Sequence, residues 1–202
     1  MRYFLVFILV ISFILMIYAF NQSKKIKVGS ILFIGDSNTA SATSYADQLQ
    51  RDYPNLRIKK VAKNGAQTSW MLPKLYEELA LKEYDLVVIL GGSNDVYGLN
   101  ENNSAKINLD SMYKMAKEHG SNVIAVTPPN KNFYINRTDT KQVLLKDLVY
   151  FIKQNKNVDK VLDFYSITND ISYFNPSDGY LHAGPEAHRL LKNKLKSEIK
   201  VN

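Results

Sequence analysis

The chain has 202 residues, which suits one domain with a single core, because domains usually hold on the order of 100 to 200 residues. Hydrophobic residues make up 46% of it, charged residues 22% and aromatic residues 11%, a balance that excludes a disordered chain. The net charge of +7 comes from lysines scattered along the sequence, without a helix-turn-helix, zinc-finger or RNA-binding pattern. We therefore expect a solvated basic surface and no nucleic-acid partner, with attraction to an anionic membrane or polymer as the alternative.

The first predicted element is an apolar stretch from Tyr3 to Phe20 that contains no charged residue and no Asn, Gln, Gly or Pro. As a helix it would be about 27 Å long, close to the roughly 30 Å of a bilayer's hydrocarbon core. A cleaved signal peptide is the alternative, but its apolar region usually has ~7 to 15 residues and a small-x-small cleavage site follows it. Residues 18–22 lack such a site, so the pattern favours an uncleaved transmembrane helix.

The predicted organisation is therefore a membrane anchor or signal segment over residues 1–22, a short polar linker over 23–29 and one domain over 30–202. Arg2 precedes the apolar stretch and lysines follow it, so the positive-inside rule does not decide its orientation. We expect an extracytoplasmic domain, because N-terminal segments of this kind are common export signals. Oligomeric state is not predicted by the sequence.

From Gly29 onward, short β-branched runs alternate with longer amphipathic stretches, which is typical of βαβ units and a parallel sheet. The run 86–90 is apolar throughout, as expected for a central strand covered on both faces. Strands are expected at 31–34, 57–62, 86–90, 123–126 and 160–162, and helices at 45–53, 68–83, 107–119, 141–154 and 185–199.

Ligands of open parallel sheets bind beyond the carboxyl ends of the strands, so the residues that follow each strand are candidates for function. Three of these strand ends are rich in Gly, Ser, Asn and Asp, which also occur in ordinary turns. The segments are Gly35-Asp36-Ser37-Asn38, Asn64-Gly65 and Gly91-Gly92-Ser93-Asn94-Asp95.

A serine hydroxyl becomes a nucleophile when a base takes its proton and donors stabilise the oxyanion that forms. Gly35 permits a tight turn that exposes Ser37. The backbone N–H of Gly65 and the side-chain amide of Asn94 are suitable oxyanion donors. These three strand ends therefore predict a nucleophile with its oxyanion hole.

The base must come from another part of the chain. Asp178 and His182 lie just ahead of the last predicted helix, and an Asp beside a His orients the imidazole and stabilises the imidazolium. His182 is therefore the candidate base, with an ordinary loop histidine as the alternative. His188 falls inside the helix and is expected to pack against the core or support the site, and His119 is expected to cap a helix C-terminus. With no cysteine and no HExxH motif, a metal-dependent hydrolase is not expected.

With these residues in place, the chain resembles the SGNH hydrolase family, also called GDSL-like lipases and esterases. Gly35-Asp36-Ser37 is similar to the family's first block, Gly65 to its second, and residues 92–95 to its third. Residues 178–182 are similar to its fifth block. The four blocks appear in the family's order and bracket residues 31–190.

The resemblance implies a three-layer αβα sandwich with a flavodoxin-like sheet of about five parallel strands in the order 2-1-3-4-5. It implies a carboxylic ester hydrolase without cofactor, in which Ser37 is the nucleophile, His182 the base and Asp178 its orienting acid. The oxyanion hole would consist of the backbone N–H groups of Ser37 and Gly65 and the side chain of Asn94. In one respect the chain departs from the family: three residues separate Asp178 from His182, where the family usually has two. Asp178 is therefore the poorest match to the family among these site residues.

Several functions stay open at this stage. The leading hypothesis is hydrolysis of a small-molecule or polymer ester, including deacetylation of a cell-wall or exported polysaccharide. Lipid or lysophospholipid hydrolysis and acyl transfer to a sugar use the same residues. A binding module that keeps the fold without turnover is a further alternative. A nucleotide or flavin binder is disfavoured, because the sequence contains neither GxGxxG nor GxxxxGK[ST].

Overall fold

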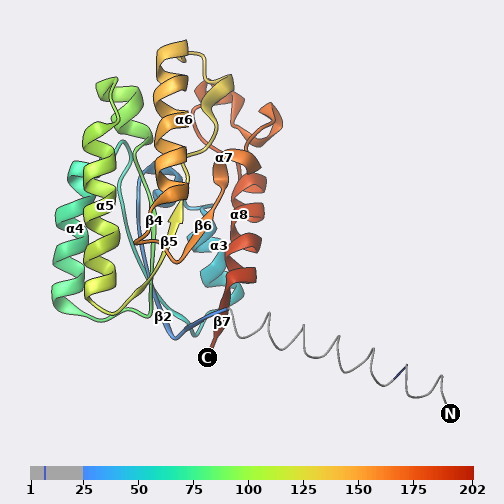
Figure 1. Cartoon of the computed structure of the whole chain (residues 1–202). Helices are drawn as coiled ribbons and strands as arrows, with labels where there is room; N and C mark the ends of the chain where they lie inside the picture. Colours follow the sequence, from blue (N-terminus) through green and yellow to red (C-terminus); the bar gives the residue numbers. More distant parts are fainter. Residues whose placement is uncertain (1–6, 8–24) are drawn as a thin grey trace.

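The computed structural model of the chain describes residue 7 and residues 25–202 (Figure 1). The expected transmembrane helix at 3–20 lies outside the described residues apart from Phe7 and stays a prediction. Within the described part of the chain, no helix combines the length and the apolar character needed to cross a bilayer.

The main sheet contains five parallel strands in the order β3-β2-β4-β5-β6. Numbered within this sheet, the order is the expected 2-1-3-4-5. The central strand is the continuously apolar one, and all of its residues are buried. The strands are β2 (Ser30–Gly35), β3 (Arg57–Ala62), β4 (Leu86–Leu90), β5 (Asn122–Val126) and β6 (Lys160–Leu162).

Helices cover both faces of this sheet and make a three-layer sandwich, which confirms the predicted fold class (Figure 1). The helices α3 (Tyr45–Asp52) and α8 (Pro185–Glu198) pack on one face. The other face is covered by α4 (Thr68–Leu81), α5 (Asn103–Glu118) and α6 (Asp139–Gln154). Shorter elements lie in the loops: α2 (Ser37–Ala40), η1 (Asp95–Leu99), η2 (Lys131–Phe133), α7 (Phe164–Ile167), η3 (Ile171–Tyr173) and η4 (Pro176–Asp178).

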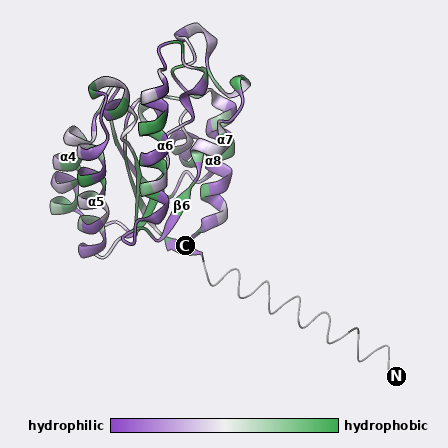
Figure 2. Ribbon diagram, turned by 45° about the horizontal axis from the view of Figure 1, so that its top comes forward, coloured by the Kyte–Doolittle hydropathy of each residue, from purple (hydrophilic) through white to green (hydrophobic). Residues whose placement is uncertain are grey.

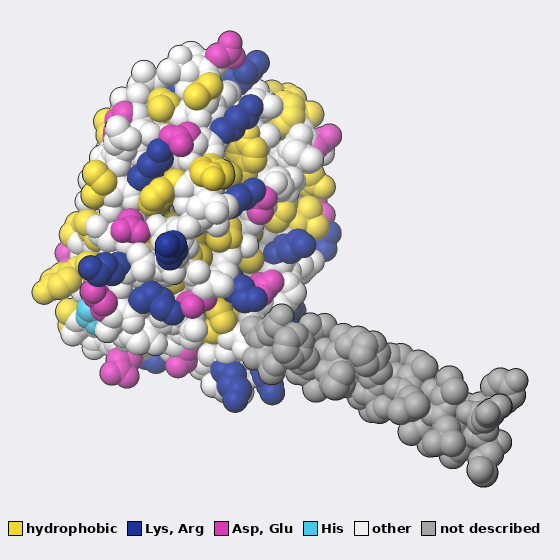
Figure 3. Space-filling model, in the orientation of Figure 1, with side chains coloured by type: hydrophobic (Ala, Val, Ile, Leu, Met, Phe, Trp, Pro, Cys, Tyr) yellow, Lys and Arg dark blue, Asp and Glu magenta, His cyan; other side chains and the backbone are white. Residues whose placement is uncertain are grey.

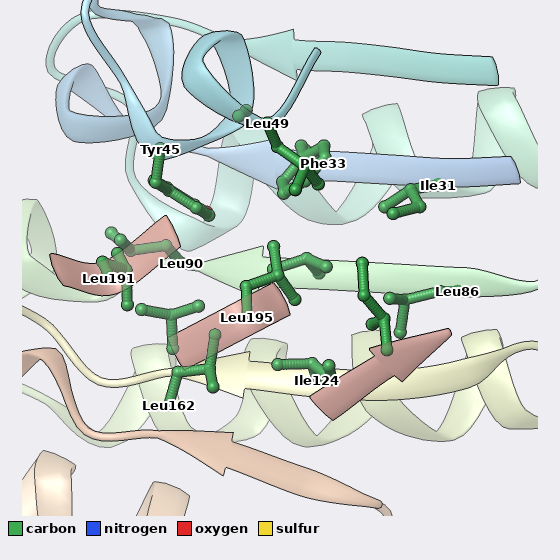
Figure 4. Close-up of a cluster of buried hydrophobic side chains, with 14 of the residues drawn as sticks. Ile31, Phe33, Tyr45, Leu49, Leu86, Leu90, Ile124, Leu162, Leu191 and Leu195 are labelled. Atoms are coloured by element: carbon green, nitrogen blue, oxygen red, sulfur yellow. The ribbon is translucent and has the colours of Figure 1, made fainter. Parts of the chain in front are cut away.

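Successive side chains of each strand point to opposite faces of the sheet, so a hydrophobic core forms on each face. On β2, Ile31 and Phe33 face the α3 and α8 side, whereas Leu32 and Ile34 face the α4, α5 and α6 side. Figure 4 shows the first of these cores, where side chains of α3 and α8 lie over β2, β4 and β5. The helices are amphipathic, with hydrophobic and hydrophilic residues interspersed along their ribbons (Figure 2), and their buried hydrophobic residues belong to the two cores. Both faces of β2 and β4 are thereby fixed, which fixes the loops that leave their carboxyl ends.

The largest difference from the predicted elements is at the amino-terminal end of the described chain. Strand β1 (Ile26–Val28) lies within the range expected to be a polar linker, and it pairs in parallel with β7 (Ile199–Val201). Ile26 and Ile199 are register partners and both are buried in the core, which explains why so short a pair forms. The short helices in the loops were not predicted, and the predicted strands and long helices differ from the observed ones only at their ends. For example, α5 begins four residues earlier than expected, where the side chain of Glu101 accepts a hydrogen bond from the Ser104 backbone N–H.

Charged residues on the face seen in Figure 3 are dispersed: lysines and arginines alternate with acidic and apolar side chains. Many of the lysines form ion pairs, among them Lys192 and Lys196, which both contact Asp52. This face therefore has the mixed, solvated character that the sequence predicts.

Candidate active site

A pocket of about 590 Å³ opens beside the carboxyl end of β2. Ser37, Asp178 and His182 all line it, although the first is more than 140 positions from the other two along the chain. Asn64, which immediately precedes Gly65, also lines it. The structure thus brings the candidate nucleophile, base and acid into one pocket.

The turn that carries Ser37 is closely packed. A Cβ added to Gly35 would lie 2.1 Å from the Thr39 side-chain oxygen, so only glycine fits between strand and helix. Asp36 is the N-cap of α2, and its carboxylate accepts a 2.9 Å hydrogen bond from the Asn38 backbone N–H. Ser37 is the first residue of α2, where a backbone N–H has no acceptor within the helix. Its N–H is therefore available to a substrate oxygen, as its predicted role requires.

The candidate base and acid are in direct contact. Nδ1 of His182 lies 2.8 Å from Oδ2 of Asp178, and Oδ1 of Asp178 accepts a 3.0 Å hydrogen bond from the Leu181 backbone N–H. The additional residue between them is accommodated by two consecutive left-handed residues, Gly179 with φ 70° and Tyr180 with φ 63°. With Nδ1 donating to Asp178, the lone pair of Nε2 is left to accept a proton.

Asn38, which was not among the residues expected to form the site, connects the nucleophile turn to the base loop. Its side chain is 2% exposed, and its Oδ1 accepts a 3.3 Å hydrogen bond from the backbone N–H of Ala183. Its Nδ2 lies 3.4 Å from Oδ1 of Asp36. The residue after the candidate nucleophile thus contacts the residue after the candidate base. An Asn next to Ser37 was visible in the sequence, but nothing in it indicated a partner 145 positions away.

The two candidate oxyanion donors from other loops lie at the ends of the strands that flank β2. Gly65 is exposed, has φ +71°, and has open space around the position of a Cβ. Asn94 does not line the pocket, and its Nδ2 donates a 2.9 Å hydrogen bond to the Ala66 carbonyl. An amide nitrogen carries two hydrogens, so one is left for a substrate.

Asp95 fixes this third strand end. Its carboxylate accepts hydrogen bonds from the hydroxyl of Thr68 at 2.6 Å and from the Thr68 backbone N–H at 3.1 Å. Burial raises the pKa of Asp95, and the two donors of Thr68 oppose this shift. The contact ties the loop after β4 to the start of α4, next to the Asn64-Gly65 turn.

Lys131 is a second residue that the sequence analysis missed. It begins η2 in the loop that follows β5, and its side chain is only 3% exposed. Burial lowers the pKa of Lys131 to about 8, and the carboxylates of Asp36 and Asp178 oppose this shift. Burial in turn raises the pKa of Asp36, and Lys131 is the largest of the opposing influences. Lysines in loops are ordinarily exposed, so nothing in the sequence indicated this arrangement.

The other two histidines contribute to packing and to helix capping. His188 is buried between the rings of Tyr45 and Phe164, at centroid distances of 6.2 and 5.6 Å, and neither of its nitrogens has a hydrogen-bond partner among the described residues. Burial lowers the pKa of His188 to about 4, with a smaller contribution from His182 in the same direction. His119 is the C-cap of α5, and its Nδ1 lies 2.9 Å from the Met115 carbonyl. Over the residues that the structure describes, no group of three or more His, Cys, Asp or Glu side chains is arranged to hold a metal ion.

Comparison with models of known protein families finds a match over most of the chain. The model of the GDSL-like Lipase/Acylhydrolase family matches residues 33–190, which is well over half of the sequence. The matched range begins in β2 and ends in α8, so it contains every candidate site residue. A search of curated proteins finds no match.

Solved structures with the same fold include several lipolytic enzymes. A lipase/acylhydrolase from Enterococcus faecalis has a TM-score of 0.66 and 25% sequence identity, over 83% of this chain and 93% of that one. A variant of Axe2, an acetyl xylan esterase from Geobacillus stearothermophilus, has a TM-score of 0.67 and 20% identity, over 88% of this chain and 99% of that one. The psychrotrophic esterase EstA from Pseudoalteromonas sp. has a TM-score of 0.65 and 18% identity, over 84% and 96%. At identities below 25%, the last two comparisons establish the fold alone.

Proposed function

Because the chain belongs to the GDSL-like lipase/acylhydrolase family, we propose that it is a serine esterase that cleaves carboxylic esters through an acyl-enzyme. The observation that carries the proposal is the 2.8 Å contact between His182 and Asp178 in a pocket that Ser37 also lines. A nucleophile, a base and an oriented acid in one pocket are the groups that acyl transfer requires.

In the proposed reaction, the Ser37 hydroxyl attacks the ester carbonyl carbon while Nε2 of His182 takes the hydroxyl proton. Asp178 stabilises the imidazolium, and the N–H groups of Ser37 and Gly65 with the Asn94 amide donate to the oxyanion. The bond between the acyl carbon and the alcohol oxygen then breaks, and His182 gives the proton to that departing oxygen. Water activated by His182 then attacks the acyl-enzyme, which releases the acid and regenerates Ser37.

A fluorophosphonate probe tests this assignment, because it forms a covalent bond only with an activated serine. We expect the wild-type chain to be labelled and Ser37→Ala to remain unlabelled. Ser41→Ala is the matched control, because Ser41 lines the same pocket and its hydroxyl contacts Thr43. Folded wild-type protein that resists the probe would favour a non-catalytic binding module.

The lining of the pocket supports a carbohydrate ester as the substrate. Part of it consists of hydroxyl and amide side chains, which can form hydrogen bonds with the alcohol half of a sugar ester. These residues are Asn38, Ser41, Thr43, Asn64, Ser172 and Asn175. One of the structurally similar proteins is an acetyl xylan esterase, which agrees with this proposal.

The acyl preference distinguishes the substrate classes. We expect hydrolysis of p-nitrophenyl acetate to exceed that of p-nitrophenyl octanoate, and acetate to be released from an acetylated polysaccharide. A preference for the longer chain would point to a lipid ester. Formation of an acetylated sugar from an acetyl donor, faster than hydrolysis, would point to acyl transfer.

The location of the chain is a separate part of the proposal. The apolar stretch 3–20 supports a membrane anchor with an extracytoplasmic domain. Because the sequence contains no cysteine, Lys194→Cys introduces a single thiol at an exposed position of α8. Labelling of intact cells with a membrane-impermeant maleimide is the expected result. Labelling only after lysis would place the domain inside the cell.

A further inference from the structure

The short pair of strands β1 and β7 exposes two lysines side by side. Lys27 and Lys200 are register partners in this parallel pair, and both side chains are exposed. Their neighbours Ile26 and Ile199 are also register partners and are buried in the core. Because successive side chains of a strand point to opposite faces, the two lysines project together from the outer face of the pair.

Among the described residues, no acidic side chain forms an ion pair with either lysine. Glu198, which ends α8 just before β7, contacts Lys160 at 3.1 Å instead. Asp85 accepts hydrogen bonds from the backbone N–H groups of Gly29 and Ser30, both at 2.8 Å. Like charges on adjacent strands repel each other, so the outer face of β1 and β7 favours an anion from outside the domain.

The pair lies at the end of the sheet opposite the pocket. Only Gly29 separates β1 from β2, whereas the pocket opens beside the carboxyl end of β2. Helix α8 runs from Pro185, which lines the pocket, to Glu198, directly before β7, and its 14 residues span about 21 Å. In Figure 1, β7 and the C terminus accordingly lie at the lower end of the sandwich, where Figure 3 shows lysine or arginine side chains.

The predicted membrane anchor closely precedes this edge in the sequence. Residues 21–25 separate the apolar stretch 3–20 from β1, and they include Lys24 and Lys25. An extended chain covers at most about 3.6 Å per residue, so β1 lies within roughly 22 Å of the end of that stretch. With the stretch in a bilayer, the edge of the domain that carries Lys27 and Lys200 is therefore the one held near the lipid headgroups.

We propose that Lys25, Lys27 and Lys200 form a membrane-contact surface that binds anionic phospholipid headgroups and points the pocket away from the bilayer. This inference rests on the membrane anchor and on the esterase activity proposed above. Charges interact over roughly 8 to 10 Å at physiological salt, and the tether allows the lysines to come within this range of the headgroups. A soluble anionic polymer would have to enter the space between domain and bilayer, so lipid is the occupant that the tether favours.

This orientation narrows the class of substrate. With β1 and β7 against the headgroups, the length of α8, about 21 Å, lies between the bilayer surface and the pocket. The ester bonds of a phospholipid lie at the interface of the bilayer and cannot cross this distance while its acyl chains stay in the membrane. The pocket therefore takes its substrate from the surrounding medium, as an ester of a polysaccharide or of another water-soluble compound.

The orientation is measured by energy transfer from a dye on the full chain to an acceptor dye on the lipid headgroups of reconstituted vesicles. Because the sequence contains no cysteine, Asn202→Cys places a single thiol beside β7. Thr140→Cys places one in the first turn of α6, at the pocket end of the sheet, and both positions are exposed. In vesicles of phosphatidylcholine with phosphatidylglycerol, we expect stronger transfer from position 202 than from position 140.

Substitution of the lysines tests whether charge maintains this orientation. Each basic residue near an anionic surface contributes about fivefold to binding, so Lys27→Gln with Lys200→Gln should lower the ratio of docked to undocked domain about 25-fold. The difference in transfer between the two dye positions should then shrink, as it should in vesicles of phosphatidylcholine alone. Lys74→Gln with Lys146→Gln is the control, because it removes the same charge from α4 and α6 and should keep the difference.

Three results of these measurements would overturn the proposal. The first is a full chain that separates from the vesicles at high salt, and the second is stronger transfer from position 140 than from position 202. The third is a difference in transfer that stays unchanged when Lys27 and Lys200 are substituted in the folded chain.

A separate assay follows the substrate. The chain in vesicles is expected to hydrolyse added p-nitrophenyl acetate and to leave the phospholipids of its own vesicle intact. Release of fatty acid from those phospholipids would contradict the orientation while supporting the esterase activity. If the chain neither hydrolyses the acetate nor reacts with the fluorophosphonate probe, the proposed function fails, whereas the transfer measurements still decide the orientation.

Discussion

The nucleophile turn and the base loop are built in different ways. Asp36 and Asn38, on either side of Ser37, are 1% and 2% exposed, and the turn leads directly from a buried strand into a helix. The side chain of His182 is 39% exposed, and it lies in a loop of short 3₁₀ turns that is held by backbone hydrogen bonds, such as the one from the Asn175 N–H to the His182 carbonyl. The sheet therefore fixes the serine rigidly, whereas the histidine depends on a few local contacts for its position.

The largest expected effect is in the base loop, the more exposed of the two regions. His182→Ala should lower the kcat of ester hydrolysis by at least about 1,000-fold. Among the described residues that line the pocket, no other side chain is hydrogen-bonded to Asp178 and could replace His182 as the base. Asp178→Asn should reduce kcat less than His182→Ala, because it removes the orienting charge and keeps the base. Circular dichroism of both variants should match the wild type. Equal losses in the two variants would mean that the loop cannot position the ring without its acid.

The next effect concerns the helix behind the base loop and depends on pH. The pKa of His188 is about 4 in the folded chain, below its usual value, because burial disfavours the imidazolium. As the pH falls, the His188 side chain is therefore protonated in the unfolded state before it is protonated in the folded state. The stability that this group contributes is full above about pH 6.5 and is lost toward pH 4, by about 3 kcal/mol. Urea unfolding at several pH values should show this loss in the wild type and a flatter profile in His188→Phe.

Substitution of two glycines tests how rigidly the nucleophile turn is packed. Gly35→Ala should destabilise the chain by about 1 to 3 kcal/mol, because the new Cβ would lie within 3 Å of the Thr39 side chain. Gly65→Ala meets open space and should cost only the strain of its positive φ, about 1 to 2 kcal/mol. Thermal melting of the two variants checks the order. A smaller loss in Gly35→Ala would show that the nucleophile turn is less rigid than its packing indicates.

The parts of the molecule that follow from local pattern were predicted from the sequence. The apolar run 86–90 is the buried central strand, and the order of strands agrees with the family resemblance. The β1 and β7 pair was missed because each strand is three residues long and the pairing joins opposite ends of the described chain. Lys131 and Asn38 were missed for a related reason. Their roles depend on tertiary contacts with residues far along the chain, which periodicity and spacing do not encode.

The contact between the two regions gives the smallest expected effect and the most direct test of the comparison. Asn38→Ala removes the acceptor of the Ala183 N–H, so the base loop loses its hydrogen bond to the nucleophile turn. Such a bond is worth about 1 kcal/mol, which corresponds to an about fivefold lower rate of labelling at Ser37 if the loop spends more time displaced. Asn64→Ala is the control, because Asn64 lines the same pocket and, among the described residues, its side chain makes no hydrogen bond to the base loop. If the base loop is the adaptable partner, hydrogen exchange should increase around Ala183 and stay unchanged at β2. Faster exchange at β2 in Asn38→Ala would instead mean that the nucleophile turn needs the loop for its own stability.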